Sequence, residues 1–135
     1  MSGRFLDTNV LVYLASGDAR KADIAERQLA EGGTVSVQVL NELANVARRR
    51  IGLGWDEIAE LLAAVRAFVA VDPLTVGTHE LGMALAERHG LSVWDAMIVA
   101  AGLLAGCDTL LSEDMQHGFV AAGQMTVVNP FAAEV

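Results

Sequence analysis

The fold is decided by the stretch RFLDTNVLVYL at residues 4–14. Arg4, Phe5 and Leu6 predict a short strand that ends at Asp7, and residues 10–14 predict a helical segment after the turn Asp-Thr-Asn. A strand that passes directly into a helix is typical of α/β proteins. Asp7 is therefore expected just past the carboxyl end of a strand.

The rest of the chain repeats this alternation of strand and helix. Apolar residues at helical spacing and Gly or Pro breaks predict helices at 20–31, 38–50, 55–67, 75–89 and 92–105. Short apolar runs predict further strands at 34–37, 68–71, 109–112 and 125–128. We therefore expect an α/β/α sandwich with a mainly parallel central sheet of about five strands, whose ligands bind at the carboxyl ends of the strands.

Length and composition favour one domain, residues 1–135, in the cytoplasm. A chain of 135 residues has the size of a single domain. The longest uncharged apolar stretch, 96–107, is well short of the ~20 residues that a membrane helix needs. Asp7 and Asn9 interrupt the only apolar stretch near the N-terminus, so no secretory signal is expected. The single cysteine, Cys107, is expected to be a reduced, structural thiol.

The net charge of −8 argues at first against a nucleic acid partner, because phosphate binding depends on Lys and Arg. However, positive charges cluster at Arg20-Lys21 and at Arg48-Arg49-Arg50, and a bound divalent cation would invert the charge of an acidic pocket. No Lys or Arg follows Arg88, although several acids do. The last third of the sequence thus has carboxylates without cations nearby in the chain.

Three of the acids have an ordinary structural interpretation. Asp7 can cap the helix that follows it, and Asp114 can cap a turn after the strand at 109–112. Asp95 follows Ser92 at the spacing of a capping box. For each of these residues alone, a capping role is the simpler interpretation.

Glu42 and Asp95 lie in apolar surroundings that capping does not explain. Glu42 is in mid-helix, with Val39 and Val46 on the same helical row, where an unpaired buried charge is costly. A salt bridge to Arg49 is the alternative interpretation. Asp95 is followed by apolar residues at the i+3 and i+4 positions and is the only charge between residues 88 and 108.

Together, the four acids Asp7, Glu42, Asp95 and Asp114 predict one metal site. Two follow strands, one begins a buried helix and one lies on an apolar helical row, so all four can converge at the carboxyl edge of the sheet. Their mutual repulsion would be severe without a cation. An all-oxygen site suits Mg²⁺ or Mn²⁺ rather than zinc. The histidines lack ligand spacing; we expect them at the surface or at helix ends, with His117 the one best placed for a local role in the site.

Four segments also resemble, in order and spacing, the motifs of the PIN-domain family. They are Phe5-Leu6-Asp7-Thr8-Asn9, Asn41-Glu42-Leu43, Asp95-Ala96-Met97-Ile98-Val99-Ala100 and Leu111-Ser112-Glu113-Asp114. The resemblance covers essentially the whole chain and is greatest to VapC-type toxins, the ribonuclease halves of prokaryotic toxin–antitoxin pairs. Ser112 stands where threonine is common in the family.

This resemblance implies a divalent-metal-dependent endoribonuclease that hydrolyses RNA phosphodiester bonds. By resemblance, the four acids would be the catalytic and metal-binding residues, with Thr8, Asn9 and Ser112 as polar supports. Glu113 and Asp108 are expected to be solvated. The partners implied are an RNA substrate, a cognate antitoxin that places a basic segment in the acidic pocket, and a second copy of the chain. A homodimer would double the cluster Arg48, Arg49 and Arg50, which we expect to border the RNA path.

Two other functions are compatible with an acid after the first strand. A receiver domain or an aspartyl phosphatase needs a late lysine, but Lys21 is the only lysine, and the phosphatase motif needs a second acid where this chain has Asn9. The other alternative is a PIN fold that binds without catalysing, which the presence of all four acids disfavours.

Overall fold

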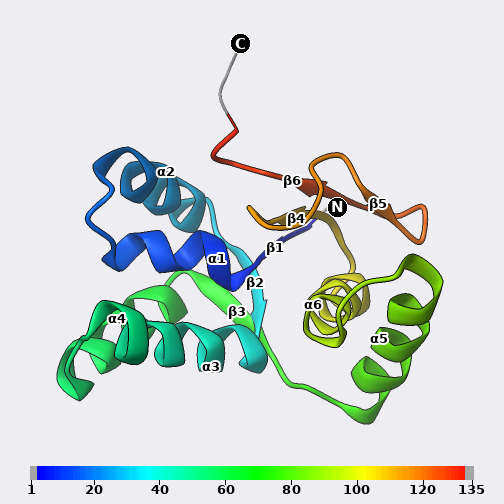
Figure 1. The fold of residues 1–135 in the computed structure, drawn as a ribbon, viewed down its shortest axis with the longest axis horizontal. Coiled ribbons are helices and arrows are strands. Elements are labelled where there is room, and N and C mark those ends of the chain that lie inside the picture. Colours follow the sequence, from blue (N-terminus) through cyan, green and yellow to red (C-terminus); the bar gives the residue numbers. More distant parts are fainter. Residues whose placement is uncertain (1–2, 133–135) are drawn as a thin grey trace.

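The computed structural model describes residues 3–132, which form an α/β/α sandwich around a six-stranded sheet (Figure 1). The strands are β1 (Gly3–Leu6), β2 (Gly33–Ser36), β3 (Val69–Asp72), β4 (Cys107–Leu111), β5 (Val120–Ala121) and β6 (Met125–Val128). The helices are α1 (Thr8–Leu11), α2 (Ala19–Ala30), α3 (Val37–Val46), α4 (Trp55–Arg66), α5 (Val76–His89) and α6 (Val93–Leu104). A 3-10 turn, Val12–Ala15, extends α1, and a π turn, Ala47–Ile51, extends α3.

The strand order is β3-β2-β1-β4-β6-β5, and every neighbouring pair is parallel except β5 with β6. The chain moves outward from β1 to β2 and β3, then returns to place β4 on the other side of β1. The order in which the chain adds strands therefore reverses between β1 and β4, and α/β proteins open a binding crevice at such a position. The expected mainly parallel sheet is confirmed. The additional strand, β5, has two residues and is too short to carry an alternating pattern.

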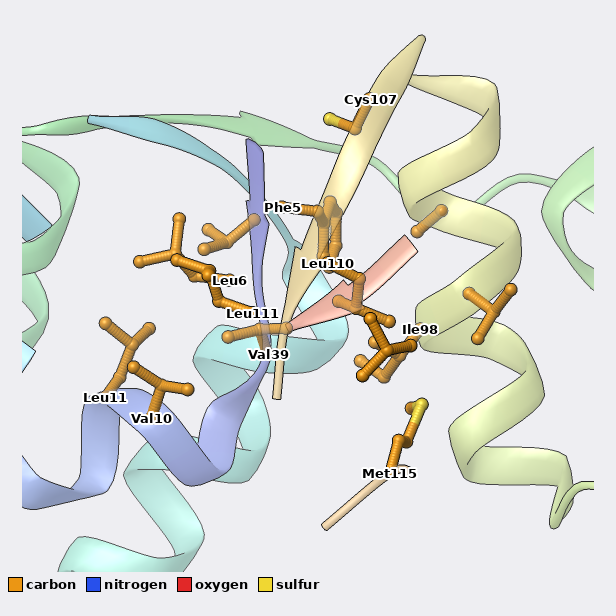
Figure 2. Close-up of a cluster of buried hydrophobic side chains, with 14 of the residues drawn as sticks. Phe5, Leu6, Val10, Leu11, Val39, Ile98, Cys107, Leu110, Leu111 and Met115 are labelled. Carbon is orange, nitrogen blue, oxygen red and sulfur yellow. The ribbon is translucent and has the colours of Figure 1, made fainter. Parts of the chain in front are cut away.

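Helices cover both faces of the sheet, with α1 to α4 on one side and α5 and α6 on the other (Figure 1). Consecutive residues of β1, Phe5 and Leu6, are both fully buried because each points to a different covered face. Figure 2 shows Leu6 and Leu11 to one side of the strand and Ile98 across the sheet beside α6. This double core fixes β1 and β4 firmly beneath the site.

The turn before β2 requires glycine. Gly33 has a φ of 146°, and a Cβ there would lie 2.6 Å from the Arg4 carbonyl oxygen. Only glycine tolerates both the backbone conformation and this approach to β1.

Two further predictions concern Cys107 and membrane-spanning helices. Cys107 is buried as a free thiol, as expected, and burial raises its pKa. Within residues 3–132, none of the helices has the length and apolar content needed to cross a bilayer.

Candidate functional site

A pocket of about 350 Å³ opens at the carboxyl edge of the sheet. It is lined by Asp7, Thr8, Asn9, Val12, Tyr13, Glu42, Val46, Arg50, Trp94, Asp95, Ile98, Glu113 and Asp114. All four predicted acids are in this set, although they come from four separate segments of the chain. A larger groove between α2 and residues 130–132 contains none of them.

Asp7 lies at the floor of the pocket because the sheet puts it there. Leu6 of β1 pairs with Leu111 of β4, and the Asp7 N–H continues the ladder by donating to the Leu111 carbonyl over 2.9 Å. The Asp7 carboxylate accepts from the Thr8 N–H at 2.7 Å and so caps α1, as expected. It is only 5% exposed.

Two side chains also hold the Asp7 carboxylate, in addition to the Thr8 N–H. Ser112, which follows β4, donates its hydroxyl to Asp7 Oδ2 over 2.9 Å, and the Asn9 amide donates to the same oxygen over 3.2 Å. Asn9 also accepts from the Glu113 N–H at 2.9 Å, so it joins the turns after β1 and β4. The expected support by Asn9 and Ser112 matches this network.

Burial raises the pKa of Asp7 to about 7. The cause is mainly desolvation, which outweighs the lowering effect of the Ser112 and Thr8 hydrogen bonds; the charges of Asp95 and Glu42 raise the pKa further. The floor of the pocket is therefore a site where a carboxylate needs a compensating positive charge.

Glu42 faces Asp7 from α3, which begins directly after β2. Its Oε1 accepts from the Thr8 hydroxyl at 3.0 Å and lies 3.5 Å from the Gln38 amide nitrogen. No ion pair joins it to Arg49 among residues 3–132, so the alternative salt bridge is wrong. Thr8 thereby connects the first acidic segment to the second.

Asp95 enters the pocket from the first turn of α6. The Ser92 hydroxyl accepts from the Asp95 N–H at 3.1 Å, which is the helix cap that the sequence predicts. The Asp95 carboxylate lines the pocket with the Ser92 side chain beside it. Its pKa is raised by desolvation and by the charge of Asp114, against a smaller lowering by the Ser92 hydrogen bond.

Asp114 is exposed, whereas its neighbour Glu113 is held in place. Lys21 Nζ lies 2.5 Å from Glu113 Oε2, and the Tyr13 hydroxyl donates to Glu113 Oε1 over 2.6 Å. Lys21 also lies over the ring of Tyr13, 4.7 Å from its centroid. The expectation that Glu113 is solvated and without a cation is wrong: α2, distant in sequence, supplies the cation.

The three consecutive arginines have different surroundings. Arg48 donates to the Leu53 carbonyl over 3.1 Å and stacks at 4.8 Å on Trp55. Arg49 lines a separate groove beside Trp55, and Arg50 alone lines the acidic pocket. The expected role for His117 in the site finds no support, because its ring accepts from the Asn129 N–H and does not line the pocket.

The donor chemistry of the pocket fits a hard divalent cation. Its charged ligands are carboxylate oxygens, with neither sulfur nor imidazole among the lining groups. Within residues 3–132, no three acidic, histidine or cysteine side chains are drawn together tightly enough to form a closed metal cage. The acids thus share one pocket and repel one another, but their side chains are not arranged around a single metal position.

The sequence also matches a family model, described as the PIN domain, over residues 4–122. The chain belongs to the PIN domain family. The match includes all four acids, the polar residues around Asp7 and the arginine cluster. A comparison with curated protein sequences found no match.

Solved structures with this PIN fold include toxins of the VapC type. Mycobacterium tuberculosis VapC20, described as a sarcin-ricin loop cleaving toxin, is 28% identical with a TM-score of 0.67, over 82% of this chain and 89% of that one. A toxin–antitoxin complex from Klebsiella pneumoniae is 21% identical with a TM-score of 0.70, over 95% of this chain and 98% of the other. DNA-bound VapBC from Salmonella typhimurium is 14% identical with a TM-score of 0.68, over 94% and 97%.

Sequence reasoning missed several residues that line or support the pocket of this PIN domain. Tyr13 lies four residues after Asn9, and Gln38 lies four residues before Glu42, so helical spacing alone could have placed both beside predicted site residues. Trp94 precedes Asp95, is 68% exposed, and accepts from the Gln38 amide through its carbonyl. Lys21 carried no signal, because its partner Glu113 is 92 residues away.

Proposed function

We propose that this PIN-domain protein is a divalent-metal-dependent endoribonuclease and the toxin of a toxin–antitoxin pair. The observation that carries the proposal is the convergence of Asp7, Glu42, Asp95 and Asp114 on one pocket, where burial, and to a smaller extent the charges of Asp95 and Glu42, raise the pKa of the Asp7 carboxyl. RNA as the substrate follows from the similarity to VapC20, whose structure is described as that of a sarcin-ricin loop cleaving toxin.

The four carboxylates would hold Mg²⁺ or Mn²⁺, with Asp7 as the most rigid ligand. When bound, the cation supplies Lewis-acid activation of the scissile phosphate and of water. Ser112, Asn9 and the Thr8 N–H orient the Asp7 oxygens, and the Thr8 hydroxyl orients Glu42. These contacts fix the direction of two ligands before substrate arrives, which reduces the cost of organising the reacting groups.

The test is cleavage of a labelled single-stranded RNA with Mg²⁺ or Mn²⁺, compared with the same reaction in EDTA. Asp7→Asn and Asp95→Asn should each reduce cleavage and weaken Mn²⁺ binding in a titration. Asp108→Asn is the matched control, since Asp108 is an exposed acid at the opposite end of β4 and lies outside the pocket. Cleavage that survives EDTA, or Mn²⁺ binding unchanged in both pocket variants, would contradict the proposal and favour a binding module.

The antitoxin and the homodimer belong to the same proposal. The structural relatives include toxin–antitoxin complexes, and an acidic pocket attracts an inserted Arg or Lys. Apolar side chains exposed along α5 and α6, Val76, Met83, Val93 and Leu104, offer a surface for association. Induced expression should arrest bacterial growth for the parent and not for Asp7→Asn, and light scattering should give twice the monomer mass.

A further inference from the structure

We propose that Arg50 is the residue of the arginine cluster that binds the RNA backbone beside the metal site, contacting a phosphate next to the scissile one. The inference rests on the ribonuclease function proposed above and divides the cluster into one substrate-binding residue and two helix-end residues. It starts from the placement of Arg50 in the acidic pocket, whereas Arg48 and Arg49 face elsewhere.

Helix geometry explains why Arg50 reaches the pocket. Glu42, Val46 and Arg50 follow one another at intervals of four residues, and all three line the pocket. After Val46 the helix widens into the π turn Ala47–Ile51, where the Gly52 and Leu53 N–H groups both donate to the Ala47 carbonyl over 3.0 Å. A wider turn contains more residues, so Arg50 is brought closer to the line of Glu42 and Val46 than an α turn would place it. π turns of this kind are frequent at functional sites.

Of the other two arginines, Arg48 is held by local contacts and Arg49 lies outside the acidic pocket. Arg48 is held by the Leu53 carbonyl and by stacking on Trp55, which fixes the chain as it leaves the π turn. Arg49 lies beside Ala44, Asn45 and Trp55 in a groove that contains none of the four acids. Neither Arg49 nor Arg50 has a hydrogen-bond or ion-pair partner among residues 3–132, so what distinguishes Arg50 is that it lines the acidic pocket.

Arg50 shares the pocket with the acids but forms no ion pair with them among residues 3–132, which leaves its guanidinium available to a phosphate. Eight residues separate Glu42 from Arg50, about 12 Å along an α-helix at 1.5 Å per residue. Side chains on a helix lean toward its N-terminus, which favours a guanidinium that extends back along the pocket in the direction of Glu42. The RNA backbone would then meet two kinds of group in succession. The carboxylates would hold the metal that binds the scissile phosphate, and the Arg50 guanidinium would bind the next phosphate, which it can do in a bidentate manner.

The experiment compares Arg50→Gln with Arg49→Gln, which removes the same charge from the adjacent position. Binding of a fluorescently labelled single-stranded RNA of mixed sequence is measured over a range of salt concentrations, together with kcat and KM for Mg²⁺-dependent cleavage and a Mn²⁺ titration without RNA. Loss of one charge-assisted phosphate contact should weaken RNA binding and raise KM about tenfold in Arg50→Gln. It should also lower the salt slope of binding by about one, while Mn²⁺ affinity and the thermal midpoint stay at parental values.

Arg49→Gln should leave KM and the salt slope near the parental values, and Arg50→Lys should recover part of the loss. Equal effects of Arg49→Gln and Arg50→Gln would overturn the inference, because they would show a diffuse field of charge. A change in Mn²⁺ affinity in Arg50→Gln would also overturn it, by placing Arg50 with the metal ligands. Failure of the parent protein to cleave or bind RNA is a separate outcome that refutes the ribonuclease proposal itself.

Discussion

The two walls of the acidic pocket are built differently. One wall includes Asp7, at the floor of the pocket, and its supports Ser112 and Asn9; these residues follow adjacent parallel strands and are joined by hydrogen bonds of 2.9 to 3.3 Å. The other wall carries Asp95 and Asp114 on a helix start and a loop, more exposed and with few side-chain hydrogen bonds.

The difference means that one wall provides a fixed ligand geometry, whereas the other provides carboxylate oxygens that are accessible to a ligand. The wall that contains Asp7 is rigid because backbone pairing between β1 and β4 sets its geometry. Burial in this wall raises the pKa of Asp7. The more exposed wall keeps the carboxylate oxygens of Asp95 and Asp114 available to a ligand. We infer that a cation is positioned by the first wall and enclosed by the second, and three predictions test this contrast.

The largest expected effect is on the stability of the metal-free protein. Asp7 has a pKa of about 7 when folded, against 3.8 as the ordinary value, so the folded state retains a proton that the unfolded state has lost between these pH values. The free energy of unfolding therefore falls as pH rises from about 4 to about 7, and it levels off above that. Asp7→Asn keeps the helix cap and removes this loss, which is about 4 kcal/mol at pH 8.

Thermal or denaturant unfolding in EDTA at pH 4 and pH 8 measures this effect. Asp7→Asn should exceed the parent in stability at pH 8 and approach it at pH 4, while Asp114→Asn, in the exposed wall, should change little at either pH. Addition of Mn²⁺ should stabilise the parent and not Asp7→Asn. A variant Asp7→Asn that is less stable than the parent at pH 8 without metal would show that the carboxylate is mainly structural.

The next effect concerns the hydroxyl that supports Asp7. Ser112→Ala removes the 2.9 Å hydrogen bond that favours the charged carboxylate, so the pKa of Asp7 should rise further. Mn²⁺ binding near neutral pH should then weaken, by about tenfold for the loss of one charge-assisted hydrogen bond. Ser112→Thr retains the hydroxyl and is the control. A Ser112→Ala variant that binds Mn²⁺ like the parent from pH 6 to pH 8 would contradict the view that this wall is organised by its supports.

The same contrast explains how much could be predicted from the sequence. The strands that end just before Asp7 and Ser112, and the helices that carry Glu42 and Asp95, follow from local patterns: apolar runs, helical spacing and caps. The α/β fold was predicted correctly, and the four acids line one pocket because the carboxyl ends of parallel strands and the starts of the following helices meet at one edge; their role as metal ligands stays a prediction.

What the sequence could not reveal depends on contacts between distant segments. The pairing of Lys21 with Glu113 arises only when α2 packs beside the turn after β4. The helix predicted over 38–50 changes into a π turn at Ala47, and this change moves Arg50 closer to the line of Glu42 and Val46 than a regular helix would. Apolar spacing alone predicts a regular helix through that region.

The smallest expected effect comes from the contact that stiffens the more exposed wall. Glu113 precedes Asp114, and its carboxylate is fixed between Lys21 and the Tyr13 hydroxyl, while its N–H donates to Asn9. Lys21→Met should free the side chain of Glu113 and let Asp114 sample more positions, so kcat should fall a few-fold while the RNA salt slope changes little. Because the pair is partly exposed, its effect on unfolding should be small. Glu113→Gln should give a similar loss of kcat, and the double variant should lose no more than either single one, since both break the same contact. Additive losses would mean that Lys21 acts on RNA directly through its charge, and the more exposed wall would then be organised by substrate and not by the protein.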